Sequence, residues 1–161
     1  MITNQIAFIG NNHQKNNLCI SNLLKPATES RSIEGTTNIK LNDEFEFQLI
    51  QRVQLGEAIN DLESNSASLL GVVLLIDTNQ PNYLSYLIDA LSAFKIHLEK
   101  SALAIGIISE ASSYGQLDFI NKRIRDFGFK GPVFDISAES RADVVTLLEA
   151  LLVSLDYKIT A

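Results

Sequence analysis

One acidic residue stands where ligand-binding residues usually occur in α/β proteins. Asp77 closes the apolar run Leu69–Asp77 and opens the polar turn Thr78–Pro81. The run is rich in β-branched residues and shows no two-residue alternation, which predicts a central strand covered by helices on both faces. Ligands of open α/β sheets bind at the carboxyl ends of the strands. A ligand site is therefore expected at the edge where Asp77 lies.

Most other patterns that support catalysis or metal binding are missing. His13 and His97 are the only histidines and Cys19 is the only cysteine. None of them has a neighbour at metal-ligand spacing, so no zinc site is predicted, and Cys19 is expected to be a small core residue. The nucleophile elbow G-x-S-x-G is absent. A receiver domain would need an acidic pair after its first strand, which Ile9–Asn11 does not offer. His13 is the better functional candidate of the two histidines, although a solvated loop histidine is the more ordinary interpretation.

Length and charge narrow the class of protein. The chain has 161 residues, so we expect one domain over residues 1–161. It carries 13 basic and 19 acidic residues, a formal charge of −6 without a dense basic cluster, which argues against nucleic acid as a partner. Its apolar runs are far shorter than the roughly 20 residues that cross a bilayer, so no membrane insertion is expected. Without a signal-like start or a cysteine pair, we expect a cytoplasmic protein.

Apolar periodicity predicts six strands and five helices in the order β-α-β-β-α-β-α-β-α-β-α. The expected strands are 5–9, 36–41, 44–53, 69–77, 102–109 and 132–136, and the expected helices are 18–24, 56–66, 83–100, 116–127 and 140–157. Residues 11–17 and 27–35 are expected to be polar loops. This order predicts a three-layer α/β/α sandwich with a six-stranded, mostly parallel sheet and one antiparallel edge strand, supplied by the hairpin 36–53.

That order, with a hairpin second and third, resembles the order of a Ras-like G domain, a P-loop NTPase-like fold. Gly10 ends the first strand where a phosphate loop would begin, and Thr36 and Thr37 stand where a switch threonine would be. Gly56 and Glu57 follow the third strand where the second switch would start. Over nearly its full length the chain resembles the compact bacterial Ras-like GTPases of the gliding- and twitching-motility polarity group. The resemblance implies that Thr36, Thr37, Gly56 and Glu57 belong to segments that bind partners.

The phosphate-loop motif itself is degenerate. In G-x-x-x-x-G-K-[ST], glycines let backbone N–H groups converge on phosphate, the lysine neutralises its oxygens and the hydroxyl binds magnesium. Counted from Gly10, these positions hold Lys15, Asn16 and Asn17, and a shift by one residue makes Lys15 the lysine but leaves Asn16 at the hydroxyl position. An anion nest at Asn11 and Asn12 stays open as an alternative. The candidate residues of this degenerate loop are Gly10, Asn11, Asn12, His13, Lys15, Asn16 and Asn17.

The remaining nucleotide motifs are altered as well. Val53 replaces the magnesium-holding acid of Asp-x-x-Gly, and Ser109–Ser112 replaces the guanine-reading Asn-Lys-x-Asp. Ser137–Glu139 keeps the shape of the family's last loop, but we interpret it as the N-cap region of the final helix. Phosphoryl transfer depends on positioning and electrostatic stabilisation, so these losses together remove its machinery.

The losses favour a non-catalytic pseudo-GTPase that serves as a protein-interaction or regulatory module, with no catalytic residue, no metal ligand and no cofactor. The resemblance implies a roadblock-type regulator or a polarity or pilus component as its partner. The alternative is a divergent switch protein with weak GTP binding and slow hydrolysis, in which Lys15, Thr37 and Asp77 surround GTP and magnesium. A homodimer is compatible with either hypothesis.

Overall fold

The structure is a computed structural model that describes residues 4–24, 31–33, 36–40, 46–52, 69–95, 102–108 and 114–160. These ranges form seven strands and four helices. The strands are β1 (Asn4–Gly10), β2 (Arg31–Ile33), β3 (Thr36–Lys40), β4 (Glu46–Arg52), β5 (Leu69–Asp77), β6 (Ala102–Ile108) and β7 (Val133–Ile136). The helices are α1 (His13–Leu24), α3 (Tyr83–Phe94), α4 (Tyr114–Phe127) and α5 (Arg141–Thr160). The predicted helix 56–66 lies outside the described residues.

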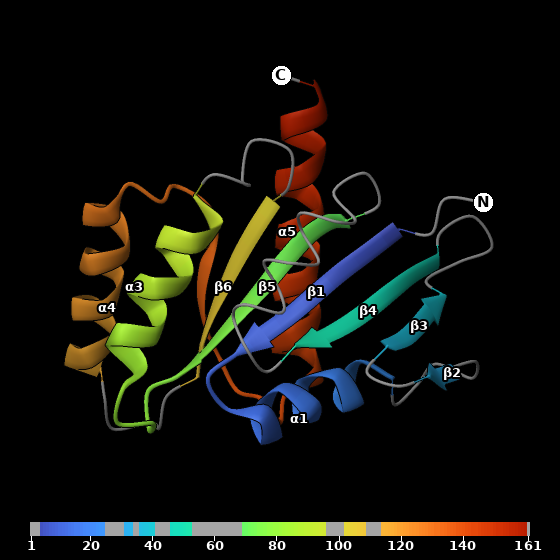
Figure 1. Cartoon of the computed structure of the whole chain (residues 1–161), viewed down its shortest axis with the longest axis horizontal. Helices are drawn as coiled ribbons and strands as arrows, with labels where there is room; N and C mark the ends of the chain where they lie inside the picture. The colour runs from blue at the N-terminus through green and yellow to red at the C-terminus, as the bar shows by residue number, and fades with distance from the viewer. Residues whose placement is uncertain are drawn as a thin grey trace.

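All seven strands belong to one sheet in the order β2-β3-β4-β1-β5-β6-β7 (Figure 1). Strands β4, β1, β5, β6 and β7 pair in parallel, and β3 runs antiparallel to both β4 and β2. The mostly parallel sheet and the β3–β4 hairpin are confirmed. The prediction of six strands with the antiparallel one at the edge is wrong, because β2 pairs outside β3. Residues 31–33 lie in a predicted loop, and three residues are too few to show a periodic pattern.

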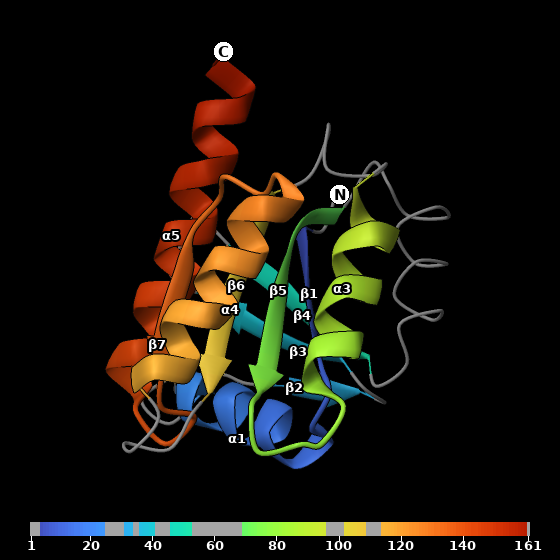
Figure 2. The ribbon, with the colours of Figure 1, turned by 90° about the vertical axis from the view of Figure 1, so that its left-hand side faces the viewer.

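Helices cover both faces of the sheet, and alternate residues of its central strands face the two helical layers. Figure 2 shows α5 on one side of the sheet and α3 on the other. Val73 and Leu75 of β5 pack in the cluster that contains Cys19 of α1 and Leu147 of α5. The other cluster joins alternate residues of β5 to α3 and α4; its members include Val72, Leu74, Ile76, Leu87, Leu91, Phe94, Ile120 and Ile124. Both faces of β5 are therefore buried, as its continuous apolar sequence predicts.

Helix α1 begins earlier than its sequence predicts. It starts at His13, so the predicted loop 11–17 is wrong for all but its first two residues. The Oδ1 atom of Asn12 accepts hydrogen bonds from the N–H groups of Gln14 at 3.1 Å and Lys15 at 3.3 Å, which is an N-cap. Polar side chains fill the exposed side of the first turn, and this conceals the helical period. Only Asn11 and Asn12 connect β1 to α1.

Among the described helices, none is both long enough and apolar enough to span a bilayer.

Candidate functional site

The carboxyl ends of β1 and β5 are joined by a side chain. Gly10 is in register with Leu75 of β5. Beyond that pair, Asn11 Nδ2 donates to the carbonyl oxygen of Asp77 at 3.0 Å, and the N–H of Asp77 donates to Asn11 Oδ1 at 2.7 Å. The amide of Asn11 thus continues the parallel pairing of the two strands past the end of β1.

Asn12 connects the same aspartate to helix α1. Its Nδ2 donates to Asp77 Oδ2 at 2.7 Å, while its Oδ1 caps the helix. The other carboxyl oxygen, Asp77 Oδ1, accepts the N–H of Asn79 at 3.0 Å. Only 2% of Asp77 is exposed. Both of its carboxyl oxygens and both polar atoms of the Asn12 amide therefore have hydrogen-bond partners. We call Asn11, Asn12 and Asp77 the Asn–Asp turn.

A third asparagine fills the space beneath this turn. Asn16 is 1% exposed. In the amide orientation that satisfies both of its polar atoms, Asn16 donates to the carbonyl oxygen of Asn12 and accepts the N–H of Gly10, each at 3.2 Å. A Cβ atom on Gly10 would collide with the side-chain amide of Asn16 and lie 2.5 Å from the carbonyl oxygen of Leu75. The end of β1 is therefore packed closely against both α1 and β5.

These groups do not fit a nucleoside triphosphate with magnesium. A phosphate loop needs several residues between strand and helix, so that free N–H groups can surround the phosphate. Here the connection has two residues, and the N–H groups of Gln14 and Lys15 already donate to Asn12. Asp77 adds a buried carboxylate, which would repel a phosphate. Asn16 stands at the position of the phosphate-binding lysine when the motif is counted from Gly10, and its side chain is turned into the protein.

Histidine 13 takes part in contacts outside the Asn–Asp turn. His13 is exposed, and its Nδ1 lies 3.1 Å from Gln51 Nε2 of β4, while its Nε2 lies 3.2 Å from Asn17 Nδ2. Asn17 is exposed as well, and Lys15 is half-buried on the first turn of α1. His13 therefore links α1 to β4, and the structure shows no catalytic partner for it among the described residues.

The predicted switch residues lie apart from the Asn–Asp turn or outside the described residues. Thr36 and Thr37 belong to β3, where they pair with Ile50 and Leu49. Through β4 and β1, Thr37 is in register with Gly71, at the start of β5. Asp77 lies six residues further along β5, or about 20 Å at the usual rise per residue. The structure therefore does not bring Thr37 and Asp77 together.

Two predicted residues and one predicted segment remain to be placed. Gly56 and Glu57 lie outside the described residues. In the segment 137–139, Ser137 Oγ accepts the N–H of Glu139 at 3.4 Å, and the N-cap of α5 is the next residue, Ser140, whose Oγ accepts the N–H of Asp143 at 3.2 Å. The interpretation of this loop as an N-cap region is confirmed.

Sequence reasoning did not assign the N-cap role of Asn12 or its bond to Asp77. An asparagine directly before a helix is a readable cap signal, but here the polar first turn hides the helix that it caps. No local signal pairs two residues that are 65 positions apart.

No model of a known protein family matches the chain, and no curated protein sequence matches it. Among solved structures, the chain is similar to an ADP-ribosylation factor-like GTP-binding protein, the small COPII coat GTPase SAR1 from Encephalitozoon cuniculi, in complex with GDP. The TM-score is 0.67, and the match covers 98% of this chain and 82% of that one at 10% sequence identity. The fold is that of a small GTPase. The predicted Ras-like fold is confirmed, and at this identity the likeness concerns the fold alone.

Proposed function

We propose that this chain is a pseudo-GTPase, which neither holds GTP at the Asn–Asp turn nor hydrolyses it, and which acts by binding other proteins. The observation that carries the proposal is the 2.7 Å hydrogen bond from Asn12 Nδ2 to the buried Asp77 carboxylate. It occupies the place where a G domain needs free donors and positive charge. A triphosphate there could not bind the N–H groups of Gln14 and Lys15, because they already donate to Asn12. It would also face the negative charge of Asp77.

A small-GTPase fold without the nucleotide chemistry supports the proposed role in protein binding. A small GTPase normally changes the shape of its partner-binding surface when its γ-phosphate is lost. If the Asn–Asp turn is permanently closed, that surface keeps one shape and binds constitutively. The earlier resemblance suggests a cytoplasmic role in a bacterial polarity, pilus or motility system, with a roadblock-type regulator as the partner.

The alternative function is a divergent GTP-binding switch with slow hydrolysis. It is favoured by one observation, that the similar small GTPase structure is a complex with GDP. In that case Lys15, the only lysine on the first turn of α1, would be the residue to neutralise phosphate.

Nucleotide content and turnover separate the two functions. Protein purified without added nucleotide is denatured, and the released nucleotide is quantified by anion-exchange chromatography; phosphate release is then followed with GTP and magnesium. We expect no stoichiometric nucleotide and no phosphate release above a blank. Stoichiometric GDP or GTP, or phosphate release that Lys15→Ala abolishes and Lys122→Ala leaves intact, would overturn the proposal. Lys122 is a suitable control because it is exposed on α4.

The interaction role has its own test. Tagged protein is used to capture partners from the source cells in buffer with GTP, with GDP or without nucleotide. Constitutive binding predicts the same partner in all three, and its loss on Thr37→Arg but not on Lys122→Glu. Capture that requires GTP would contradict the proposal.

A further inference from the structure

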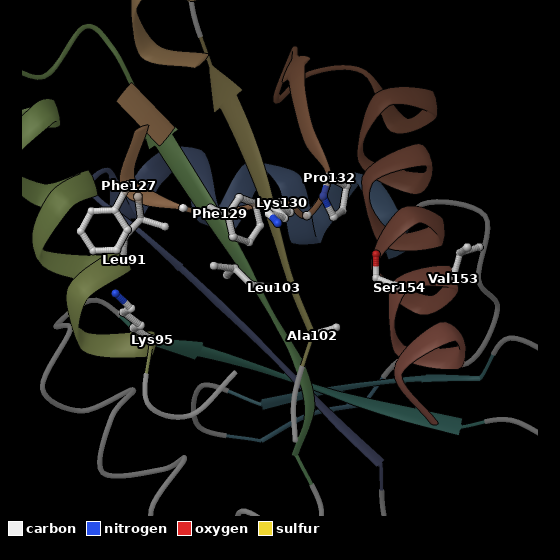
Figure 3. A pocket seen from close by; sticks show the side chains of 12 residues that line it. Leu91, Lys95, Ala102, Leu103, Phe127, Phe129, Lys130, Pro132, Val153 and Ser154 are labelled. Atoms are coloured by element: carbon white, nitrogen blue, oxygen red, sulfur yellow. The ribbon is translucent and has the colours of Figure 1, made fainter. Parts of the chain in front are cut away.

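A second candidate site lies at the opposite edge of the sheet from the Asn–Asp turn. It is a cavity of about 770 Å³ between α3, α4, α5 and the start of β6. That volume falls in the range of roughly 300–1,000 Å³ that is usual for small-molecule sites. Figure 3 shows Phe127, Leu91 and Lys95 at one end, Val153 and Ser154 at the other, and Leu103 and Phe129 between them. The described residues that line it are Leu91, Lys95, Ala102, Leu103, Phe127, Gly128, Phe129, Lys130, Gly131, Pro132, Val153 and Ser154.

One wall of the cavity, the segment 128–131 between α4 and β7, is held in place by specific contacts. The guanidinium of Arg125 donates to the carbonyl oxygens of Phe129 at 3.0 Å and Gly131 at 3.2 Å. Gly128 has a φ of 103°, which favours glycine, and its N–H donates to the carbonyl oxygen of Arg125 at 3.0 Å, which ends α4. A Cβ on Gly131 would collide with the Phe129 ring. These contacts within the chain fix the conformation of the wall.

The chemistry of the lining is apolar with a positive rim. The described lining includes two lysines and no acidic residue, although the chain as a whole carries a charge of −6. Lys95 and Lys130 are exposed, and Lys95 Nζ lies 5.6 Å from the centre of the Phe127 ring. Leu91 and Leu103 are almost fully buried and form an apolar floor. Such a cavity is complementary to a molecule with an apolar body and an acidic head.

We propose that this cavity binds a free long-chain carboxylate, with its head group at Lys95, its alkyl chain along Leu91, Leu103 and Phe129, and Lys130 adding to the positive charge of the rim. The lining side chains run from Phe127 at one end to Val153 at the other, with Leu103 and Phe129 between them (Figure 3). The proposal does not depend on the absence of GTP from the Asn–Asp turn. The two sites lie at opposite edges of the sheet and are tested separately.

A single fluorescent reporter can locate the ligand. The chain contains no tryptophan, and Val153 is 70% exposed at the rim of the cavity, so Val153→Trp introduces one reporter without disturbing the core. Titration with 11-bromoundecanoate should quench its emission saturably, because bromine quenches tryptophan at contact. Binding of dodecanoate below its micelle concentration, followed by calorimetry on the unmodified chain, should be one to one. Calorimetric binding without quenching would place the ligand elsewhere and overturn the proposal.

Chain length and head group test the assigned chemistry. Burial of each added methylene should raise the affinity by about fourfold from octanoate to dodecanoate. Decyltrimethylammonium, with the opposite head-group charge, should bind more weakly than undecanoate. Equal affinity for the cationic and anionic amphiphiles, or no dependence on chain length, would overturn the proposal. Binding only to phosphatidylglycerol vesicles and not to free dodecanoate would do the same.

Charge reversal at the rim completes the test. Lys95→Glu and Lys130→Glu should each weaken dodecanoate binding by about fivefold, as expected for a partly exposed ion pair. Lys122→Glu makes the same change in net charge away from the cavity and should leave binding within about twofold. Equal effects of the three variants would show that only net charge matters and would refute the assigned head-group site. Sedimentation of a dimer that dodecanoate does not dissociate would identify a second copy of the chain as the occupant instead.

Discussion

Replacing Asn12 removes two interactions from opposite ends of one side chain. The Oδ1 atom caps α1 through the N–H groups of Gln14 and Lys15, and the Nδ2 atom donates to Asp77 at 2.7 Å. The substitution Asn12→Ala deletes both. Asn12→Ser keeps a good cap but is too short to reach the Asp77 carboxylate. The pair of variants therefore separates the cap from the bond that closes the turn.

The expected magnitudes follow from these two contacts. Loss of an N-cap costs about 1 kcal/mol of folding free energy, and loss of a hydrogen bond to a charged group costs about 2 kcal/mol, since a buried carboxyl oxygen is left without its donor. Asn12→Ala should therefore lower the free energy of unfolding by about 3 kcal/mol, and Asn12→Ser by about 2 kcal/mol. For a chain of this size, 3 kcal/mol lowers Tm by roughly 6–12 °C.

Urea unfolding at pH 7, followed by far-ultraviolet circular dichroism, measures both variants against the unmodified chain. The comparison is valid where the dependence of the unfolding free energy on urea is unchanged. A loss of no more than about 1 kcal/mol for Asn12→Ala would mean that the cap alone was lost. An equal loss in Asn12→Ser and Asn12→Ala would mean that the bond to Asp77 accounts for everything. Either result would refute the two-part account of this side chain.

Three further variants or labels probe other described contacts. Gly10→Ala should destabilise the fold by about 1–3 kcal/mol, measured in urea, because its methyl group would meet Asn16 and the Leu75 carbonyl oxygen; an unchanged stability would contradict this close packing. Burial raises the pKa of Cys19 to about 11, and the charge of Lys15 opposes this shift. Iodoacetamide at pH 8 should therefore label Cys19 only after unfolding. Rapid labelling of the native protein would be inconsistent with a buried thiol. Burial also raises the pKa of Tyr86 from 10.0 to about 12, so the contribution of this group to stability should be complete below pH 10 and lost as pH rises through 12. The substitution Tyr86→Phe should lessen that alkaline loss of stability in urea titrations at pH 9 and pH 11. An identical loss in both proteins would exclude the tyrosine as its cause.

The sequence predicts the parts of the fold whose burial pattern is continuous. Residues 71–77 and 102–108 are buried on both faces of the sheet, and uninterrupted apolar runs locate β5 and β6 within a residue of their observed ends. The sequence does not predict the edge strand β2, because three residues carry no period. The sequence predicts a start for helix α1 that is too late, because the exposed first turn of this helix is wholly polar. In both elements the sequence lacks the apolar periodicity that a buried face would produce.

The candidate site shows the same division. Asp77 could be identified as the polar end of a buried strand, and the loss of a phosphate-loop lysine could be read directly from Asn16. The mutual bonds among Asn11, Asn12 and Asp77 could not, because they depend on which strands lie side by side in the sheet. Without the order of the strands, the sequence does not distinguish an open polar turn from a turn that is closed by these hydrogen bonds. The apolar cavity at the other edge likewise draws its residues from α3, α4, α5 and β6.

The central claim is that the Asn–Asp turn does not bind the phosphates of a nucleotide, because the N–H groups of Gln14 and Lys15 already donate to Asn12. The most direct measurement is a titration of ¹⁵N-labelled protein with GTP and magnesium in which the backbone amide signals of Gln14 and Lys15 are monitored. The amide protons of these two residues point at Asn12 Oδ1. We predict that these two signals stay in place up to millimolar GTP. A saturable shift of both signals, absent when the magnesium complex of inorganic sulfate replaces GTP, would show that the turn opens to nucleotide and would contradict the account.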